Sequence, residues 1–315
     1  MKSVSAFLVN STLQRHSRTS SKPNPKIVVL SMMVSLTCLA AISQTASAQT
    51  SAQAGTQTKD KKDESPWNVS LGLFVATAPE YEGGKKRVAS ALPDFNLSYR
   101  TQDFGTFGIG SKSRGASWTI IDKEEYSFGI ALGGAAGRED KKDGTAFRPG
   151  SARLRGMGEI KASAEFGVFG HILAGVPISL QIMKGTGDGK PDSNNFSIKG
   201  PGGTRAELGV EIPWKLDEQF TLSFSHSVSW ADKKYTQTYF GVTNAQAART
   251  NFKEYTAKGG IKSLNFGVGL NYQIDKHWSA NAGVSYSQLQ GSAAKSPITE
   301  KKGQPGAVVG IGYTF

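Results

Sequence analysis

Cysteine and histidine are scarce in this sequence, and long apolar runs are nearly absent. The 315 residues include one cysteine, Cys38, and four histidines. Cys38 lies inside an apolar run over 27–42, so a chain processed after residue 48 contains no thiol. This excludes a disulfide framework and thiol chemistry. Beyond that run no segment stays apolar for about 18 residues, so the sequence predicts no transmembrane helix.

The first 48 residues have the pattern of a secretory signal peptide. Basic residues at 2, 15, 18, 22 and 26 precede the apolar run, and Ala46-Ser47-Ala48 follows it as a small-residue cleavage site. We therefore predict that residues 1–48 are removed. Residues 49–66 (QTSAQAGTQTKDKKDESP) are polar and of mixed charge, which predicts a disordered periplasmic arm.

The last nine residues, AVVGIGYTF, alternate as a lipid-facing strand does. Ala307, Val309, Ile311, Tyr313 and Phe315 share one face, and small or polar residues occupy most of the other. Because every backbone group in hydrocarbon must be hydrogen-bonded, such a strand has to close a barrel. The terminal aromatic residues, Tyr313 and Phe315, also resemble the signal that the barrel assembly machinery recognises in bacterial outer-membrane barrels.

Segments of alternating hydrophobicity fill the remainder of the chain from residue 67. Eleven further strands are predicted near 67–75, 88–99, 104–112, 114–121, 126–137, 151–166, 168–183, 203–214, 220–230, 264–274 and 278–288. Short connections alternate with long polar ones, as periplasmic turns alternate with outer loops. The sequence therefore predicts an all-β fold, a transmembrane antiparallel β-barrel of about 12 strands over residues 67–315. A soluble β-sandwich or a lipocalin-like barrel is the alternative.

Two of these segments carry charge on one face only, and this predicts a charged lumen. Charged residues oppose an apolar face in both 151–166 and 203–214. The lumen-lining candidates are Arg153, Arg155, Glu159, Lys161, Arg205, Glu207 and Glu211. Their mixed signs favour a salt-bridged plug, and a narrow pore for small charged solutes is the alternative.

Few residues in the chain suggest catalysis or metal binding. Outside the predicted signal peptide the histidines are His171, His226 and His277, which lack metal-ligand spacing. His226 is in phase with the lipid-facing residues of its strand, an unusual place for a polar side chain. We predict no catalytic residues, no metal, no cofactor and no nucleic-acid partner. The positive charge of the chain, formally +12, favours contact with lipopolysaccharide phosphates.

Several stretches resemble the MipA/OmpV family of outer-membrane proteins. Ala78-Pro79-Glu80-Tyr81-Glu82-Gly83 is similar to the family's A-P-x-Y-x-G segment, and the block over 230–249 (WADKKYTQTYFGVTNAQAAR) follows the family pattern. Residues 291–298 (GSAAKSPI) extend the likeness towards the last strand. One departure is Gly84-Lys85-Lys86-Arg87, where the family is more acidic.

The resemblance implies an outer-membrane barrel of a Gram-negative bacterium. By the family's name it also implies a non-enzymatic scaffold for peptidoglycan-remodelling enzymes, a murein lytic transglycosylase and a murein synthase. A narrow channel and a surface adhesin built on the 232–257 loop are the alternatives. The aromatic residues of that loop, Tyr235, Tyr239 and Phe240, are expected either to fold into the barrel mouth or to form an adhesive tip.

Overall fold

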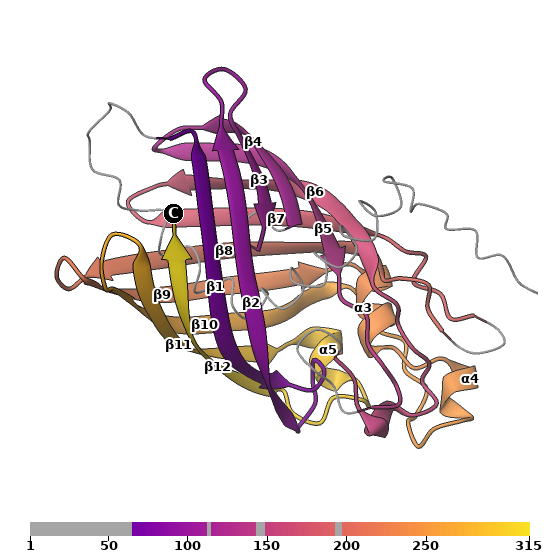
Figure 1. Cartoon of the computed structure of the whole chain (residues 1–315). Helices are drawn as coiled ribbons and strands as arrows, with labels where there is room; N and C mark the ends of the chain where they lie inside the picture. Colours follow the sequence, from indigo (N-terminus) through magenta and orange to yellow (C-terminus); the bar gives the residue numbers. More distant parts are fainter. Residues whose placement is uncertain (1–64, 112–114, 143–148, 193–196) are drawn as a thin grey trace, which may run out of the picture.

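Twelve antiparallel strands, each paired with its neighbours in sequence, close into a barrel in the computed structural model (Figure 1). The structure describes residues 65–111, 115–142, 149–192 and 197–315. The predicted signal peptide, 1–48, and the predicted arm up to residue 64 lie outside the described residues. The barrel closes where the first strand pairs with the last, with Val75 opposite Val309.

The strands differ widely in length. Their bounds are β1 Trp67–Pro79, β2 Arg87–Arg100, β3 Thr106–Gly110, β4 Gly115–Asp122, β5 Tyr126–Ala135, β6 Ser163–Leu173, β7 Pro177–Thr186, β8 Gly202–Lys215, β9 Phe220–Ala231, β10 Gly260–Gln273, β11 Trp278–Leu289 and β12 Gly303–Thr314. The predicted fold class, an antiparallel barrel of twelve strands, is confirmed. The β3–β4 hairpin is the short part of the wall.

Side chains on the strands alternate between an apolar outer face and a small or polar inner face. In β1, Leu73 is 54% exposed and faces outward, whereas Ser70, three residues earlier and on the opposite face, is buried inside. Val309 in β12 is likewise 56% exposed. This alternation is what a wall with lipid on one side and a polar interior requires, because successive strand residues point to opposite faces.

One end of the barrel holds the start of β1, the C-terminus and the short turns, and we call it the turn end. Aromatic residues form cross-strand pairs there: Trp67 with Tyr99, Phe107 with Trp118, Phe220 with Tyr272, and Trp278 with Tyr313. Aromatic rings of this kind concentrate at membrane–water interfaces. They therefore mark the turn-end boundary of the membrane-spanning band.

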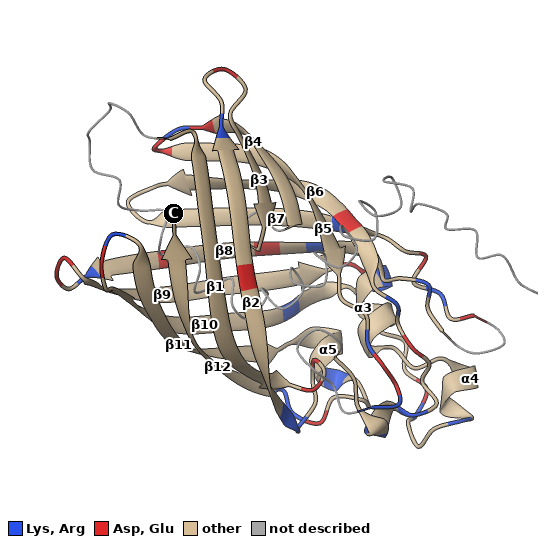
Figure 2. Ribbon diagram, in the orientation of Figure 1, with Lys and Arg blue, Asp and Glu red and all other residues tan. Residues whose placement is uncertain are grey.

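The opposite end, the loop end, carries the long connections and the short helices. These are the 3₁₀ helix η2 (Ala152–Leu154) and the α-helices α3 (Lys233–Phe240), α4 (Asn244–Ala247) and α5 (Gly291–Lys295). Asp232 caps α3, its carboxylate accepting a hydrogen bond from the Tyr235 N–H, and Thr243 and Gln246 form a capping box on α4. Charged residues gather in the loops and turns, and the wall between them carries few (Figure 2).

The predicted strand over 151–166 is wrong. Gly156 and Gly158 have φ values of +92° and +83°, a left-handed conformation that breaks a strand. Most of the segment belongs to the β5–β6 loop, and β6 begins at Ser163. The prediction failed because Leu154 and Ile160, which alternate as lipid-facing residues would, are instead fully buried among other loops.

The predicted strand over 168–183 is also wrong, because a tight turn divides it. Ala174 N–H donates to the carbonyl of Val176, and Gly175 between them has a φ of +76°. The segment therefore supplies the end of β6, the turn and most of β7. The two errors cancel in the strand count. Within the described part of the chain no helix is long and apolar enough to cross a bilayer.

Candidate functional site: the capped mouth of the barrel

Four outer loops share a hydrophobic core above the barrel mouth, which we call the cap. Its six buried side chains come from the β1–β2, β5–β6, β9–β10 and β11–β12 loops: Tyr81, Leu154, Met157, Val242, Phe252 and Ile298. All are at most 9% exposed. Because apolar burial stabilises whatever brings the surfaces together, these loops hold one another in place.

Hydrogen bonds between the loops fix their positions relative to one another in the cap. The Tyr81 hydroxyl donates to the carbonyl of Ile298 at 2.9 Å, and Gln246 Nε2 donates to the carbonyl of Met157 at 2.6 Å. Burial and the nearby Glu300 carboxylate raise the pKa of Tyr81 well above its ordinary value. Tyr81 therefore stays a neutral donor at physiological pH.

Helix α3 lies at the mouth and is attached to the barrel wall. The Asp232 carboxylate that caps it also accepts a hydrogen bond from the Thr204 N–H of β8 at 2.8 Å. The Tyr239 hydroxyl donates to the carbonyl of Ala136 at 2.6 Å, and Arg138 Nη1 donates to the carbonyl of Tyr239. Burial raises the pKa of Tyr239 and lowers that of Arg138 to about 10.

A second small cluster packs the end of α3 against the wall. Phe240 and Leu289 are almost completely buried together with Ala293 of α5. Phe240 and Tyr235, which is 6% exposed, are thus part of the closure. The loop aromatics Tyr235, Tyr239 and Phe240 therefore pack at the mouth of the barrel.

Two ion pairs join the mouth of the barrel beneath the cap. Arg205 of β8 binds Glu165 of β6 with Nη2 2.7 Å from Oε2, and Lys262 of β10 binds Glu82 of the β1–β2 loop at 2.5 Å. The Lys262 ammonium also lies 5.9 Å from the ring centroid of Tyr235. Pairing is what makes buried charges tolerable, since an isolated one costs several kcal/mol.

Deeper in the lumen the inner wall is lined by hydroxyl, amide and carboxylate groups. Ser227 donates to the Glu207 carboxylate at 2.7 Å, and the Asn265 amide donates to Ser227 and Ser229 at 3.0 and 3.1 Å. Both carboxylate oxygens of Glu211 are shielded and find no hydrogen-bond partner among the described residues. The lumen below the cap is therefore polar, with acidic groups on β8.

The predicted lumen-lining residues separate into two groups. Arg205, Glu207 and Glu211 lie on the inner face of β8. Arg153, Arg155, Glu159 and Lys161 lie in the β5–β6 loop, because the strand predicted for them does not form. Arg153 instead stacks its guanidinium 5.1 Å from the Phe252 ring centroid and lies 3.5 Å from Glu300.

Sequence reasoning missed Glu82 and Lys262 as part of the mouth, and Tyr81 as part of the cap. Glu82 and Tyr81 stand in the segment that follows β1, and neither has a local signal for its partner. Lys262 lies beside an irregularity in the β9–β10 pairing, where the register shifts between Ile261 and Ser263. That shift turns Lys262 inward, and alternation alone does not reveal it.

The three histidines that the structure describes lie apart from one another. His171 faces the lumen and shares a hydrogen bond of 2.5 Å with Ser127, and His277 lies in the last turn beside Thr314. His226 is on the outer face of β9, against the Phe266 ring. Among the described residues no group of three or more His, Cys, Asp or Glu side chains gathers to hold a metal ion.

Known proteins similar to this chain are outer-membrane proteins. The family described as "MltA-interacting protein MipA" matches residues 71–315. The outer membrane protein Omp26La of Vibrio anguillarum is 33% identical over 262 residues, which cover 80% of this chain and 88% of that protein. A 24 kDa outer membrane protein of Pasteurella multocida is 24% identical over 126 residues, 39% of this chain and about half (49%) of that protein.

Solved structures with a similar arrangement of strands are bacterial outer-membrane barrels. An outer membrane channel from Pseudomonas putida F1 aligns with a TM-score of 0.43 and 10% identity, over 82% of this chain and 100% of that one.

Proposed function

Because the chain belongs to the MltA-interacting protein MipA family and is a β-barrel of the outer membrane, we propose that it is a non-enzymatic scaffold. In this function the barrel links the outer membrane to peptidoglycan-remodelling enzymes, a murein lytic transglycosylase and a murein synthase. The family's name supplies the class of partner.

The cap is the observation that carries the proposal. A barrel whose loops share a buried core and whose mouth holds α3 is built to stay closed at the loop end. Closure of this kind serves an anchor better than a pore. The turn end, with its exposed hairpin turns, faces the periplasm in the topology of outer-membrane barrels, and it is there that murein enzymes are found.

Site-specific crosslinking tests the scaffold. A photo-reactive amino acid is placed in the arm (for example at Gln57), in a turn (Glu218) and, as a control of equal polarity, in the β9–β10 loop (Lys253). The scaffold predicts crosslinks to murein enzymes from the arm and the turn and none from Lys253. A folded barrel that gives no such adduct from any position at normal abundance would overturn the proposal.

A narrow channel for small charged solutes is the second candidate, and the unpaired carboxylate of Glu211 favours it. Glu207 lies near Arg205 and Lys262, whereas Glu211 lies further along the inner wall and forms no ion pair among the described residues. Single-channel recording of the refolded barrel in a planar bilayer separates the two functions. A silent barrel supports the scaffold, whereas discrete cation-selective steps that change with Glu211→Gln support the channel.

A further inference from the structure

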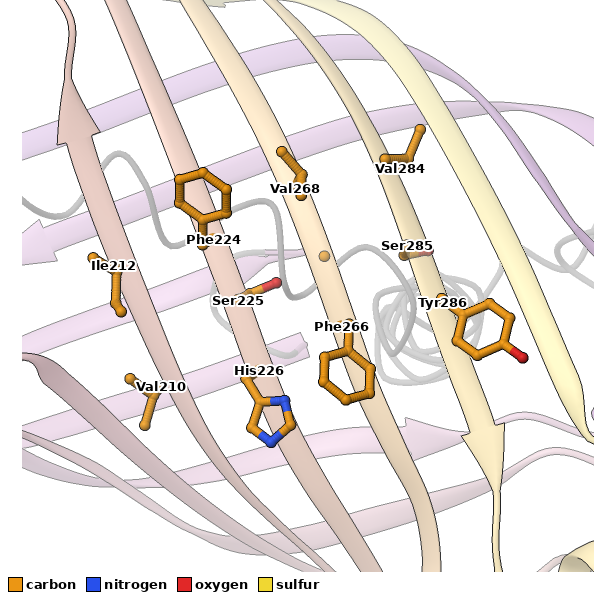
Figure 3. Close-up of a pocket in the computed structure, with 11 residues that line it drawn as sticks. Val210, Ile212, Phe224, Ser225, His226, Phe266, Val268, Val284, Ser285 and Tyr286 are labelled. Atoms are coloured by element: carbon orange, nitrogen blue, oxygen red, sulfur yellow. The ribbon is translucent and has the colours of Figure 1, made fainter.

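A hollow of about 430 Å³ lies on the lipid-facing side of the wall, across β8 to β11 (Figure 3). Its volume falls within the range of roughly 300–1,000 Å³ that is common for small-molecule sites. The side chains around it are almost all apolar or aromatic, among them Ile212, Phe224, Phe266, Val268 and Val284. Ser225, Gly267 and Ser285 alternate with these residues, so their backbone forms the floor of the hollow.

His226 places an imidazole among the apolar and aromatic side chains that surround the hollow. It lies in the middle of β9, six residues after Phe220 of the turn-end aromatic belt and four before Trp230. At about 3.3 Å per residue, Trp230 is roughly 13 Å away along the strand. An ionisable side chain at such a depth is costly unless something there hydrogen-bonds to it, and it marks a functional site by default.

Three rings form a row along the loop-end side of the hollow. The strand register places His226 opposite Phe266, and Phe266 opposite Tyr286. The His226 and Phe266 rings are 4.5 Å apart. The Tyr286 hydroxyl donates to Gln288 at 3.0 Å, so the corner of the hollow beside Tyr286 carries polar groups. The hollow thus has a polar corner at Tyr286 and an apolar body that extends toward Phe224 and Ile212.

We propose that this hollow is a binding site for the acyl chain of a membrane lipid, with His226 bonded to a hydroxyl group on that chain. The occupant follows from the location: the apolar and aromatic side chains around the hollow face the hydrocarbon layer, where acyl chains are what can fill it. A hydroxyl fits because it both donates to and accepts from an imidazole nitrogen. An unsubstituted chain leaves the imidazole unsatisfied.

Photolabelling of the mature barrel in vesicles tests the site. The probes are two phosphatidylethanolamines with a diazirine on one acyl chain, identical except that one chain also carries a hydroxyl group. The expected result is labelling of the peptides that contain Phe224–His226 and Phe266–Val268, about tenfold stronger with the hydroxylated lipid. His226→Leu is expected to abolish that preference and to leave labelling by the plain lipid unchanged.

Filling the hollow provides the second arm. Val284→Trp is expected to suppress labelling by both lipids. Val75→Trp on β1, an equally lipid-facing valine outside the hollow, is the matched control and should not suppress it. Uniform labelling of the outer wall that ignores Val284→Trp would overturn the acyl-chain site. Labelling that is lost in Val284→Trp but is indifferent to the lipid hydroxyl and to His226→Leu would overturn the role of His226.

Discussion

Arg205 and Glu165 form an ion pair across an intervening strand. Arg205 is on β8 and Glu165 on β6, and both side chains reach over β7 so that Nη2 lies 2.7 Å from Oε2. Glu165 is 2% exposed. A pair of this kind holds alternate strands together on the inner wall, in addition to the backbone ladders that join neighbours.

Removing one partner of this pair should destabilise the barrel more than removing both. Glu165→Gln or Arg205→Met leaves a buried charge unpaired, which typically costs about 3–5 kcal/mol. The double variant should recover most of that loss. Urea unfolding in detergent, followed by the heat-modifiable gel mobility of the folded barrel, measures the three variants. Single variants that unfold at the wild-type urea concentration would contradict the expectation.

Truncating the buried side chain of Ile298 should loosen the cap and spare the wall. Ile298 is fully buried, and a buried Ile→Ala change costs about 2–5 kcal/mol. Because the barrel ladders do not involve this residue, the cost falls on loop packing. Limited proteolysis of the folded barrel should cut the β9–β10 loop faster in Ile298→Ala. The exposed loop residue Lys253→Ala is the control and should be cut at the wild-type rate.

Loss of the helix cap at Asp232 should free α3 from the wall. The Asp232 carboxylate bonds both to the Tyr235 N–H of the helix and to the Thr204 N–H of β8, at 2.7 and 2.8 Å. Asp232→Ala removes both bonds, and caps are worth about 1 kcal/mol. Amide hydrogen exchange over Lys233–Phe240 should become faster, whereas Asp232→Asn should retain part of the protection.

The buried tyrosines of the cap and mouth should lose their hydroxyl protons only at a pH above that of an exposed tyrosine. Burial raises the pKa values of Tyr81, Tyr235 and Tyr239 above the ordinary value of about 10. Their folded-state pKa values exceed the unfolded ones, so their stabilising contribution is complete below about pH 10 and is lost as the pH rises further. Arg138, whose pKa burial lowers to about 10, opposes this loss in the same alkaline range.

Absorbance at the phenolate band, recorded from pH 8 to 12, checks this titration. Three tyrosines should ionise only as the cap opens, and Tyr239→Phe should remove one of them. A single step near pH 10 for all tyrosines would show that these residues are accessible to solvent.

The C-terminal aromatic residue should matter for assembly more than for stability. Phe315 is 67% exposed and makes an edge contact with the Tyr313 ring at 4.8 Å. Deleting Phe315 removes little packing, so the free energy of unfolding of the refolded barrel should stay within about 0.5 kcal/mol of the wild-type value. Its yield in the outer membrane of cells should nevertheless fall. An unchanged yield would argue against an assembly signal at Tyr313 and Phe315.

Alternation of side chains predicted most of the wall from the sequence because it is local. In β8 the charged residues Arg205, Glu207 and Glu211 oppose Leu208 and Ile212, and a slip of one residue would place charge in lipid. Such a strand can be recognised from its own residues. The same reasoning failed at 151–166, where Leu154 and Ile160 alternate in the same way, but Leu154 packs into the cap and Ile160 is buried beside Arg138 of the same loop and Ile198 of the β7–β8 loop.

The cap was beyond prediction because its contacts join distant parts of the chain. The hydrogen bond from Tyr81 to the carbonyl of Ile298 spans 217 residues. No periodicity within either segment indicates the other. Two local signals were present: Asp232 stands where a helix cap belongs, three residues before Tyr235, and Gly156 with Gly158 marks a break. The first signal indicates a helix in the β9–β10 loop, and the second indicates that the segment over 151–166 is not a continuous strand.

The shortness of β3 sets where the barrel should come apart. β1 and β2 pair along 13 residues, whereas β3 has only five residues to pair with β2 on one side and β4 on the other. A closed barrel opens first between the neighbouring strands that share the fewest backbone hydrogen bonds. Under heat or tension the wall should therefore open first at Thr106–Gly110, while longer ladders such as that between β1 and β2 remain paired.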